Sequence, residues 1–429
     1  MLRLLLLATF AGSAIAGDFT VSIRPRQTNN YPPALAVPTA AETPKEWLDA
    51  LQAATAAGKI PNIAPAMNQG GNIVYANNVG FDQATCSWTV TKCVSKNDIV
   101  NAPDNHMAIG FDDGPTSKSD DLYSFLNQYN QSATHFMIGS NVLSYPQQFS
   151  HAVKEGNQHF AVHTWSHQLC TTLTNQQVVA ELGWTMQIIA DYSGGYIPKF
   201  WRPPQGDVDN RVRAIAEEIF GLTNVLWNHD TNDWCLNDQG GSECPNVDPG
   251  KDVASVAAAV QSGIHGAKSP GLIMLEHELT HASIKIFKDY YPSIKGLGWT
   301  PGNVADLFNM PWYKNAWNNQ SPALNGTVLQ TFTLESSDAN DTSSSTSSAR
   351  APSTSAASTT PSSSIQAHVS TSNSAKGSTR AQGTTAAFTS PTSSLSKGSS
   401  TSGASTFAPG GSLGFAGLAF VAIIAANLL

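Results

Sequence analysis

Short apolar runs alternate with amphipathic stretches between residues 105 and 299. The apolar runs predict strands at 106–111, 133–138, 159–162, 199–201, 224–227 and 271–275. Apolar residues at helical spacing predict helices at 119–129, 146–154, 175–190, 208–219, 253–264 and 284–290. Such an alternation is typical of a parallel sheet, and its many short repeats favour an α/β fold closed into a (β/α) barrel. A doubly wound open sheet is the alternative, although no Gly-rich dinucleotide fingerprint follows the first strand.

The pattern changes at both ends of the chain. A basic start at Arg3, an apolar stretch over 4–16 and the closing triplet Ala14-Ile15-Ala16 predict a secretory signal peptide at 1–16. Residues 336–404 are almost entirely Ser, Thr, Ala, Gly and Pro, which predicts an extended, O-glycosylated stalk without a core. The chain then ends in the apolar run 413–429.

This end is typical of a GPI-attachment signal at 405–429, with Ser402, Gly403 and Ala404 as candidate attachment residues. A C-terminal membrane helix is the alternative; it is less favoured because no Lys or Arg follows the apolar run. We therefore expect a secreted protein held by a lipid anchor on the outer face of the cell membrane and in the wall. Candidate N-glycosylation sites on this route are Asn130, Asn319, Asn325 and Asn340, of which the second is weakened by a nearby proline.

The composition of the chain indicates fewer domains than its length alone suggests. A length of 429 residues suggests roughly three domains at about 150 residues each. Only 13% of the residues are charged, however, because the stalk and the apolar ends dilute the count. We expect one catalytic domain at 105–300, with an N-terminal extension at 17–104 and a flank at 301–335. The net charge of −8 argues against binding nucleic acid through its phosphates.

The five cysteines show no paired C-x-x-C spacing, which excludes a zinc ribbon or a thioredoxin motif. In an oxidising compartment the nearest pairs are Cys235 with Cys244 and then Cys86 with Cys93. That pairing would leave Cys170 free, but spacing alone does not fix the connectivity.

Polar residues follow the predicted strands, where a (β/α) barrel carries its chemistry. Asp112 and Asp113 end the first strand, and adjacent carboxylates can divide their work between holding a cation and acting as a base. His163 and His167 are four residues apart and can reach one metal; with Asp113 they form an open, catalytic ligand set. Arg202 can pair with Asp112. Taken singly, each motif is equally compatible with turn chemistry or surface residues.

Two further strand ends supply a carboxylate and an imidazole. Asp230 and Asp233 follow one strand, and His277 follows another, so a carboxylate can raise the pKa of the histidine toward that of a general acid. Trp234 and Leu275 can wall a small apolar pocket, although ordinary core packing explains Leu275 equally well.

In this order the motifs resemble those of the NodB-like polysaccharide deacetylases, carbohydrate esterase family 4. They read Phe111-Asp112-Asp113-Gly114-Pro115, His163-Thr164-Trp165-Ser166-His167, Arg202-Pro203-Pro204-Gln205-Gly206, Asp230-Thr231-Asn232-Asp233-Trp234 and Leu275-Glu276-His277. With the leader, stalk and GPI-like tail, the chain is similar to the fungal chitin deacetylases of that family. The resemblance covers residues 105–299 and implies a distorted (β/α) barrel.

The resemblance also implies roles for the residues. Asp113, His163 and His167 would bind a divalent metal, most simply Zn²⁺, with Co²⁺ or another divalent ion as alternatives. Asp112 would be the general base with Arg202 as its partner, and His277 the general acid with Asp230 as its partner. The Gln205 N–H would hold the oxyanion, Trp234 and Leu275 would enclose the acetyl methyl, and Asp233 would lie on the substrate side. Gly110 and Gln205 stand where the family commonly has Thr or Ser and Tyr, which affects the sugar-facing surface.

The implied reaction is the hydrolysis of N-acetyl groups of chitin, giving chitosan and acetate, by an enzyme that we expect to be a monomer. The same chemistry on partly deacetylated chitosan or another acetylated glycan is an alternative. A non-catalytic wall protein that binds glycan through Trp residues is another, and the presence of every proposed site residue counts against it.

Overall fold

The structure is a computed structural model that describes residues 30–334. The predicted leader 1–16, stalk 336–404 and attachment signal 405–429 lie outside the described residues, as do Asn340, Ser402, Gly403 and Ala404. Between residues 30 and 334, no helix has the length and apolar character needed to cross a bilayer.

A five-stranded parallel sheet forms one side of the fold, in the order β4-β5-β6-β7-β8. Its strands are β4 (Gly110–Gly114), β5 (Thr134–Met137), β6 (His159–Val162), β7 (Phe200–Trp201) and β8 (Thr223–Asn224). Strands β4 to β7 are buried at every position because helices cover the sheet outside and side chains fill it inside. Their sequences are accordingly mostly apolar, without strict alternation.

A second parallel sheet has the order β11-β3-β10-β9. Its strands are β3 (His106–Ala108), β9 (His229–Asp230), β10 (Leu272–Leu275) and β11 (Thr300–Gly302). Ile109 separates β3 from β4, so the predicted strand 106–111 is two strands. The break has a simple cause: the Ile109 N–H donates to Gly302 of β11, whereas its carbonyl accepts from Thr134 of β5.

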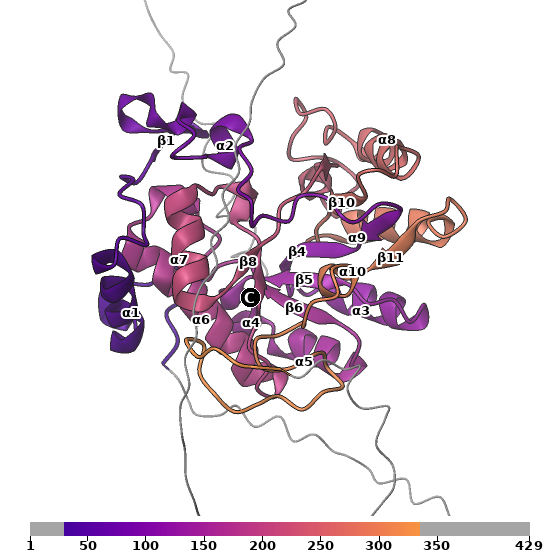
Figure 1. Ribbon diagram of the computed structural model, residues 1–429. Helices are drawn as coiled ribbons and strands as arrows, with labels where there is room; N and C mark the ends of the chain where they lie inside the picture. The colour runs from indigo at the N-terminus through magenta and orange to yellow at the C-terminus, as the bar shows by residue number, and fades with distance from the viewer. Residues whose placement is uncertain (1–29, 335–429) are drawn as a thin grey trace, which may run out of the picture. The chain divides into compact units, whose positions relative to one another are not determined.

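A parallel bridge between Asp112 and His277 joins the two sheets at one seam. At the other seam Val225 pairs with Ile99, and within residues 30–334 no ladder joins β8 to β9. The sheets therefore form a distorted, incompletely closed barrel (Figure 1). This confirms the predicted α/β fold class and excludes the doubly wound open sheet.

Helices follow the strands and cover the barrel. They are α3 (Ser119–Gln128), α4 (Gly139–Ser144), α5 (Pro146–Glu155), α6 (Asn175–Ser193), α7 (Asn210–Phe220), α8 (Val253–Ile264), α9 (His281–Tyr290) and α10 (Val304–Leu307). Capping explains two differences from the predicted ranges. Helix α7 begins at Asn210 because the Asp209 side chain accepts from Val212 N, and α9 begins at His281 because Thr280 and Ser283 form a capping box.

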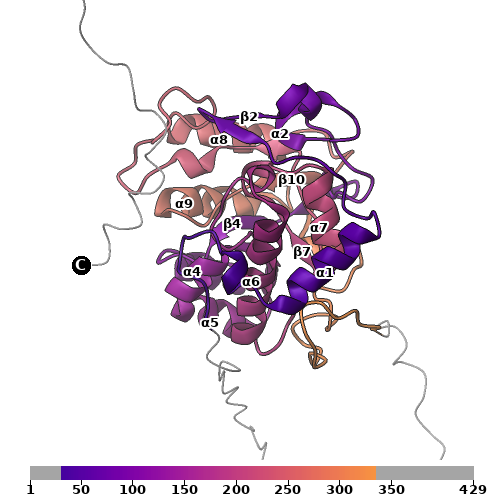
Figure 2. The ribbon, with the colours of Figure 1, turned by 90° about the vertical axis from the view of Figure 1, so that its left-hand side faces the viewer.

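The N-terminal extension packs onto the barrel through elements that the hydrophobic pattern did not indicate. These are α1 (Lys45–Ala56), the hairpin β1–β2 (Met67–Gln69 and Asn72–Val74) and α2 (Trp88–Thr91). Helix α1 lies against α6 and α7 (Figure 2). Trp47 makes edge contacts with Trp184 and Phe220, at centroid distances of 5.3 and 6.1 Å. The extension thus shares the core of the barrel.

The cysteines pair as the nearest-neighbour spacing predicts. Cys86 is bonded to Cys93 and Cys235 to Cys244, while Cys170 is free and buried. Two of the described candidate glycan sites, Asn130 and Asn325, are exposed. Asn319 differs, because its amide nitrogen donates to the carbonyl of Gln158 and its side-chain oxygen is buried. A glycan on Asn319 would break that bond, so the fold argues against this candidate.

Candidate active site

The first strand end presents two buried carboxylates. The register of β4 against β5 shifts between Asp112 and Gly114, and Asp113 lies in the left-handed region with φ 70°. This backbone interrupts the alternation of side chains, so that both carboxylates approach the same histidine. The His163 Nε2 atom lies 3.2 Å from Asp113 Oδ1 and 3.7 Å from Asp112 Oδ2. The Asn141 amide fixes the turn by donating to the Asp113 carbonyl at 2.9 Å.

Asp113, His163 and His167 bring their ligand atoms within 4.8 Å of one another. The Nε2 atoms of the two histidines lie 3.2 and 3.1 Å from Asp113 Oδ1, yet that oxygen is buried and, among residues 30–334, has no hydrogen bond of acceptable geometry. Ligands about 2 Å from a tetrahedral zinc ion lie roughly 3.3 Å apart. One carboxylate and two imidazoles at these separations therefore fit a divalent metal with open positions.

The outer nitrogen of His163 is also oriented. Its Nδ1 lies 2.7 Å from the backbone carbonyl of Arg202, which can only accept a proton, so Nδ1 carries the hydrogen. The lone pair of Nε2 then faces Asp113. A ligand histidine held in this way is typical of metal sites in proteins.

Glu181 holds the turn between the two histidines. Its buried carboxylate, on α6, accepts from the N–H groups of Trp165 and Ser166 at 2.7 and 2.8 Å and from the Ser166 hydroxyl. The turn needs such support because Thr164 and His167 both have left-handed backbones, with φ 64° and 59°. Sequence reasoning missed Glu181. The available signal was a lone glutamate on the apolar face of the predicted helix 175–190.

The structure contains the predicted pair between Asp112 and Arg202. The guanidinium donates from Nη1 to Asp112 Oδ1 at 2.7 Å and from Nε to the carbonyl of Val225 at 3.2 Å. It also lies over the ring of Phe136, with 4.0 Å between the guanidinium carbon and the ring centroid. Both partners are buried, so the pair holds the carboxylate in a fixed direction beside the histidines.

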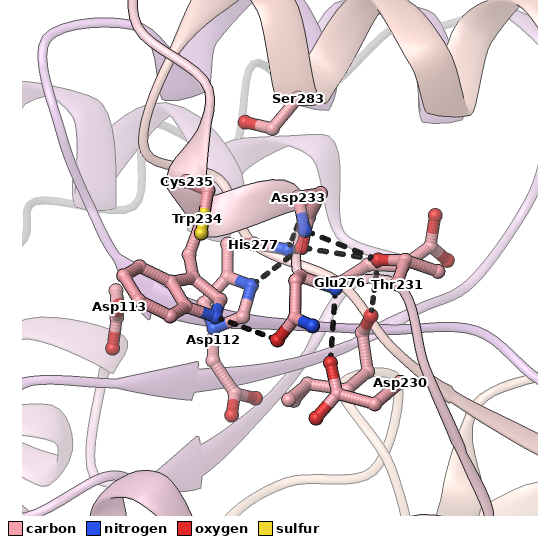
Figure 3. Close-up of polar contacts among 12 residues, drawn as sticks. Asp112, Asp113, Asp230, Thr231, Asp233, Trp234, Cys235, Glu276, His277 and Ser283 are labelled. Atoms are coloured by element: carbon pink, nitrogen blue, oxygen red, sulfur yellow. Dashed lines mark hydrogen bonds and ion pairs between the residues drawn. The ribbon is translucent and has the colours of Figure 1, made fainter. Parts of the chain in front are cut away.

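His277 pairs with Asp233 and not with Asp230, as Figure 3 shows. Its Nδ1 lies 2.7 Å from Asp233 Oδ1, and its backbone N–H donates to Asp233 Oδ2 at 2.9 Å. Burial alone would lower the pKa of His277, but the charge and hydrogen bond of Asp233 raise it to about 10. His277 is thus placed to hold a proton that its Nε2 can donate.

The prediction that Asp230 is the partner of His277 is wrong. Asp230 ends β9 with an exposed side chain that accepts from the backbone N–H of Asn232 at 2.9 Å. Asn232 then adopts a left-handed backbone, and the short turn that follows brings Asp233 back to the barrel. For the same reason Asp233 belongs with His277 and not, as the resemblance implied, on the substrate side.

Three predicted site residues remain, and they lie at or shortly after the ends of strands β7, β9 and β10. Gln205 is exposed and left-handed at φ 55°, and within residues 30–334 its N–H donates to no group. Trp234 is half-buried beside Asp233, with its indole N–H donating to the Asn232 side chain. Leu275 is buried at the end of β10. Leu275 precedes His277 by two positions in the sequence. The role of Leu275 at an acetyl group stays a prediction.

Comparison with known proteins agrees with this geometry. A polysaccharide deacetylase family model matches residues 99–225, which include Asp112, Asp113, His163, His167 and Arg202. Chitin deacetylase 3 of Cryptococcus neoformans var. neoformans is 46% identical over 290 residues, which are 67% of this chain and 67% of that protein. Chitin deacetylase of Amylomyces rouxii is 34% identical over 284 residues, 63% of each chain.

Among solved structures, peptidoglycan deacetylase PdaC from Bacillus subtilis is similar, with a TM-score of 0.40 and 24% identity. The match covers 48% of this chain and 91% of that chain. The identity and coverage of the Cryptococcus relative show the family: the chain belongs to the polysaccharide deacetylases.

Proposed function

We propose that the protein removes N-acetyl groups from chitin by metal-dependent hydrolysis, releasing acetate and leaving chitosan. One observation carries the proposal: two buried pairs, Asp112 with Arg202 and His277 with Asp233, lie at a cluster of three metal-ligand side chains. The relatives named chitin deacetylases support chitin as the substrate. A bound glycan without chemistry would not need a buried, ion-paired base and acid.

Asp113, His163 and His167 would hold the metal, which we propose to be Zn²⁺ because two imidazoles and one carboxylate suit that ion. When bound, such a metal polarises a carbonyl and lowers the pKa of a coordinated water to about 7. Every other part of the reaction falls to side chains and backbone groups of the chain.

Asp112 accepts the proton of the attacking water, and Arg202 holds its carboxylate in a fixed direction. As the acetamide carbonyl becomes tetrahedral, the N–H of Gln205 donates to the oxygen that gains charge. His277 then gives its proton to the amide nitrogen, because an amide nitrogen leaves as an amine and not as an anion. One water and one acetamide are consumed, and one amine and one acetate are formed.

The test is acetate release from chitin oligosaccharides. Asp112→Asn and Asp233→Asn should each lower kcat by at least about 100-fold, in the range seen for removed acid–base groups. Asp230→Asn is the matched control, because it neutralises a carboxylate three positions away whose side chain only caps a turn. Wild-type rates in Asp112→Asn, or equal losses in the two aspartate variants of the 230–233 segment, would refute the assignment.

We further propose that the chain is a secreted monomer anchored by GPI to the cell surface and wall. The apolar stretch 4–16, the Ser/Thr-rich stalk, the apolar end 413–429 and two disulfides support this route. Release of the protein from cells by a phosphatidylinositol-specific phospholipase C tests it. A chain that stays in the membrane after that treatment carries a spanning helix instead.

The exposed Gln205 side chain favours one refinement of the substrate. This side chain is exposed next to the backbone N–H of the same residue, which is the proposed oxyanion donor. There it can contact the sugars flanking the reacting unit. Partly deacetylated chitosan or another acetylated glycan is therefore the second candidate substrate. Initial rates on fully and partly acetylated oligomers of equal length decide between them.

A further inference from the structure

A segment of the N-terminal extension packs against the turn that carries Gln205. This segment, residues 86–98, precedes the region that the family model matches, which begins at residue 99. Its centre is the short helix α2 (Trp88–Thr91), closed into a loop by the Cys86–Cys93 disulfide. We call residues 86–98 the stapled segment.

The stapled segment is bound to the chain that follows Gln205. Arg213 of α7 donates from Nη1 to the Cys86 carbonyl at 2.6 Å and from Nη2 to the Cys93 carbonyl at 3.0 Å. Its Nε contacts Asp98 at 3.0 Å, so one buried guanidinium holds both ends of the disulfide loop. Closer to the turn, Thr89 donates to Asp207 at 2.7 Å and Trp88 N donates to Val208 O at 3.0 Å.

The Trp88 ring lies directly on the turn. A Cβ built on Gly206 would come 2.6 Å from Trp88 Cδ1 and Nε1 and 2.9 Å from Trp227 Cη2, so both indoles lie against the Cβ side of the glycine. The two rings meet edge to face at 6.1 Å, and both are buried. The indole N–H of Trp88 has no hydrogen-bond partner within residues 30–334. Packing and the disulfide, and not a polar anchor on the ring, therefore set its position.

The contact matters because the turn is conformationally demanding. Gln205 and Gly206 are consecutive left-handed residues, with φ 55° and 69°. The hydrogen bonds from Gly206 N to Pro203 O and from Asp207 N to Pro204 O close the turn. A non-glycine residue in this region persists only when its surroundings enforce it. The Trp88 ring packs against Gly206 in addition to these bonds.

We propose that Trp88, held by the stapled segment, is a positioning residue that aims the Gln205 N–H at the oxyanion. The extension then completes the catalytic centre and is not only a cover for the barrel. This inference rests on the proposed deacetylation for its kinetic consequence. It predicts in addition a physical property of the turn that exists without substrate.

The kinetic test compares Trp88→Ala and Trp88→Phe with Trp47→Ala in the full chain. Displacing a catalytic group by about 1 Å costs roughly 100-fold in rate, so Trp88→Ala should lower kcat for acetate release about 10- to 100-fold with little change in KM. Trp88→Phe, which keeps a ring on Gly206, should recover most of kcat. Trp47→Ala removes an equally buried indole of the same extension, but one that packs on α6 and α7; its folded fraction should keep the wild-type kcat.

The second measurement is amide hydrogen exchange of the peptide that spans residues 203–208. Trp88→Ala should speed exchange of the Gly206 and Asp207 amides at least ~10-fold, and Trp47→Ala, compared at equal global stability, should not. A wild-type chain that releases no acetate would refute the proposed function and leave this exchange test to decide the inference. Wild-type kcat together with unchanged exchange in Trp88→Ala would overturn the inference while leaving the deacetylase intact.

Discussion

Glu181 provides the most direct test of how the fold supports the metal ligands. Glu181→Gln keeps the size of the side chain and replaces one carboxylate oxygen with an amide NH₂ group. In one orientation the NH₂ group replaces Oε2, which accepts from Trp165 N and Ser166 N in the native turn. In the other orientation the NH₂ group faces Ser166 Oγ, which can accept from it, so that only the hydroxyl hydrogen of Ser166 loses its acceptor.

The size of the effect follows from the number of donors affected. A buried donor without an acceptor costs about 1–3 kcal/mol, and the side chain adopts the orientation that affects one donor, so the substitution should destabilise the turn by about that amount. Because His163 and His167 are at the two ends of this turn, part of that cost appears in metal binding. Loss of such a supporting contact typically lowers metal affinity about 10- to 100-fold. At saturating metal, kcat should recover toward the wild-type value.

The assay is competition for Zn²⁺ against a chromophoric chelator, combined with thermal unfolding of the metal-free protein. Thr185→Val is the matched control. It removes a buried hydroxyl on the same helix, and that hydroxyl donates to the backbone carbonyl of Glu181 and not to the carboxylate that holds the turn. A Glu181→Gln protein with native zinc affinity and only a lower Tm would contradict this expectation, because Glu181 would then stabilise the fold without positioning the ligands.

Three further predictions follow from the buried charges. Asp233→Asn should move the alkaline limb of the kcat/KM–pH profile to lower pH. Asp233 raises the pKa of His277 to about 10, and His277 must be protonated to act as the acid. An alkaline limb at the wild-type pH would contradict the pairing of His277 with Asp233. Burial raises the pKa of Glu276 from 4.5 to about 8, so the folded state binds the extra proton and stability is lost as pH rises through this window. Glu276→Gln should flatten that loss in Tm measured from pH 5 to about 9, and parallel curves would exclude it. Arg202→Leu leaves Asp112 buried without its cation and should cost about 3–5 kcal/mol in urea unfolding; a change below about 1 kcal/mol would show that the pair is not needed for stability.

Part of this site could be predicted because parallel strands bring their carboxyl ends to one edge. That rule alone places Asp112, Asp113, His163 and His277 together once the strand order is known. It could not choose between Asp230 and Asp233. Both follow the same strand, and the left-handed backbone at Asn232 decides which carboxylate returns to the barrel.

Contacts between distant segments were also beyond the sequence pattern. Nothing in the local sequence of α6 indicates that Glu181 accepts from the turn at Trp165, and no periodicity places Trp88 against Gly206. In the same way α1 carries a modest apolar face whose partners are set by tertiary packing on α6 and α7. Periodicity predicts that an element exists and which face it buries, whereas the partner of that face depends on the whole fold.

The metal dependence of the proposed deacetylation can be measured as acetate release from a chitin oligosaccharide by metal-free and by metal-restored protein. We expect no release after chelation, recovery on adding one equivalent of Zn²⁺, and no such recovery at that concentration when His163 and His167 are both replaced by Ala. Full acetate release from the metal-free protein, or from the double histidine variant without added metal, would contradict the proposed metal dependence.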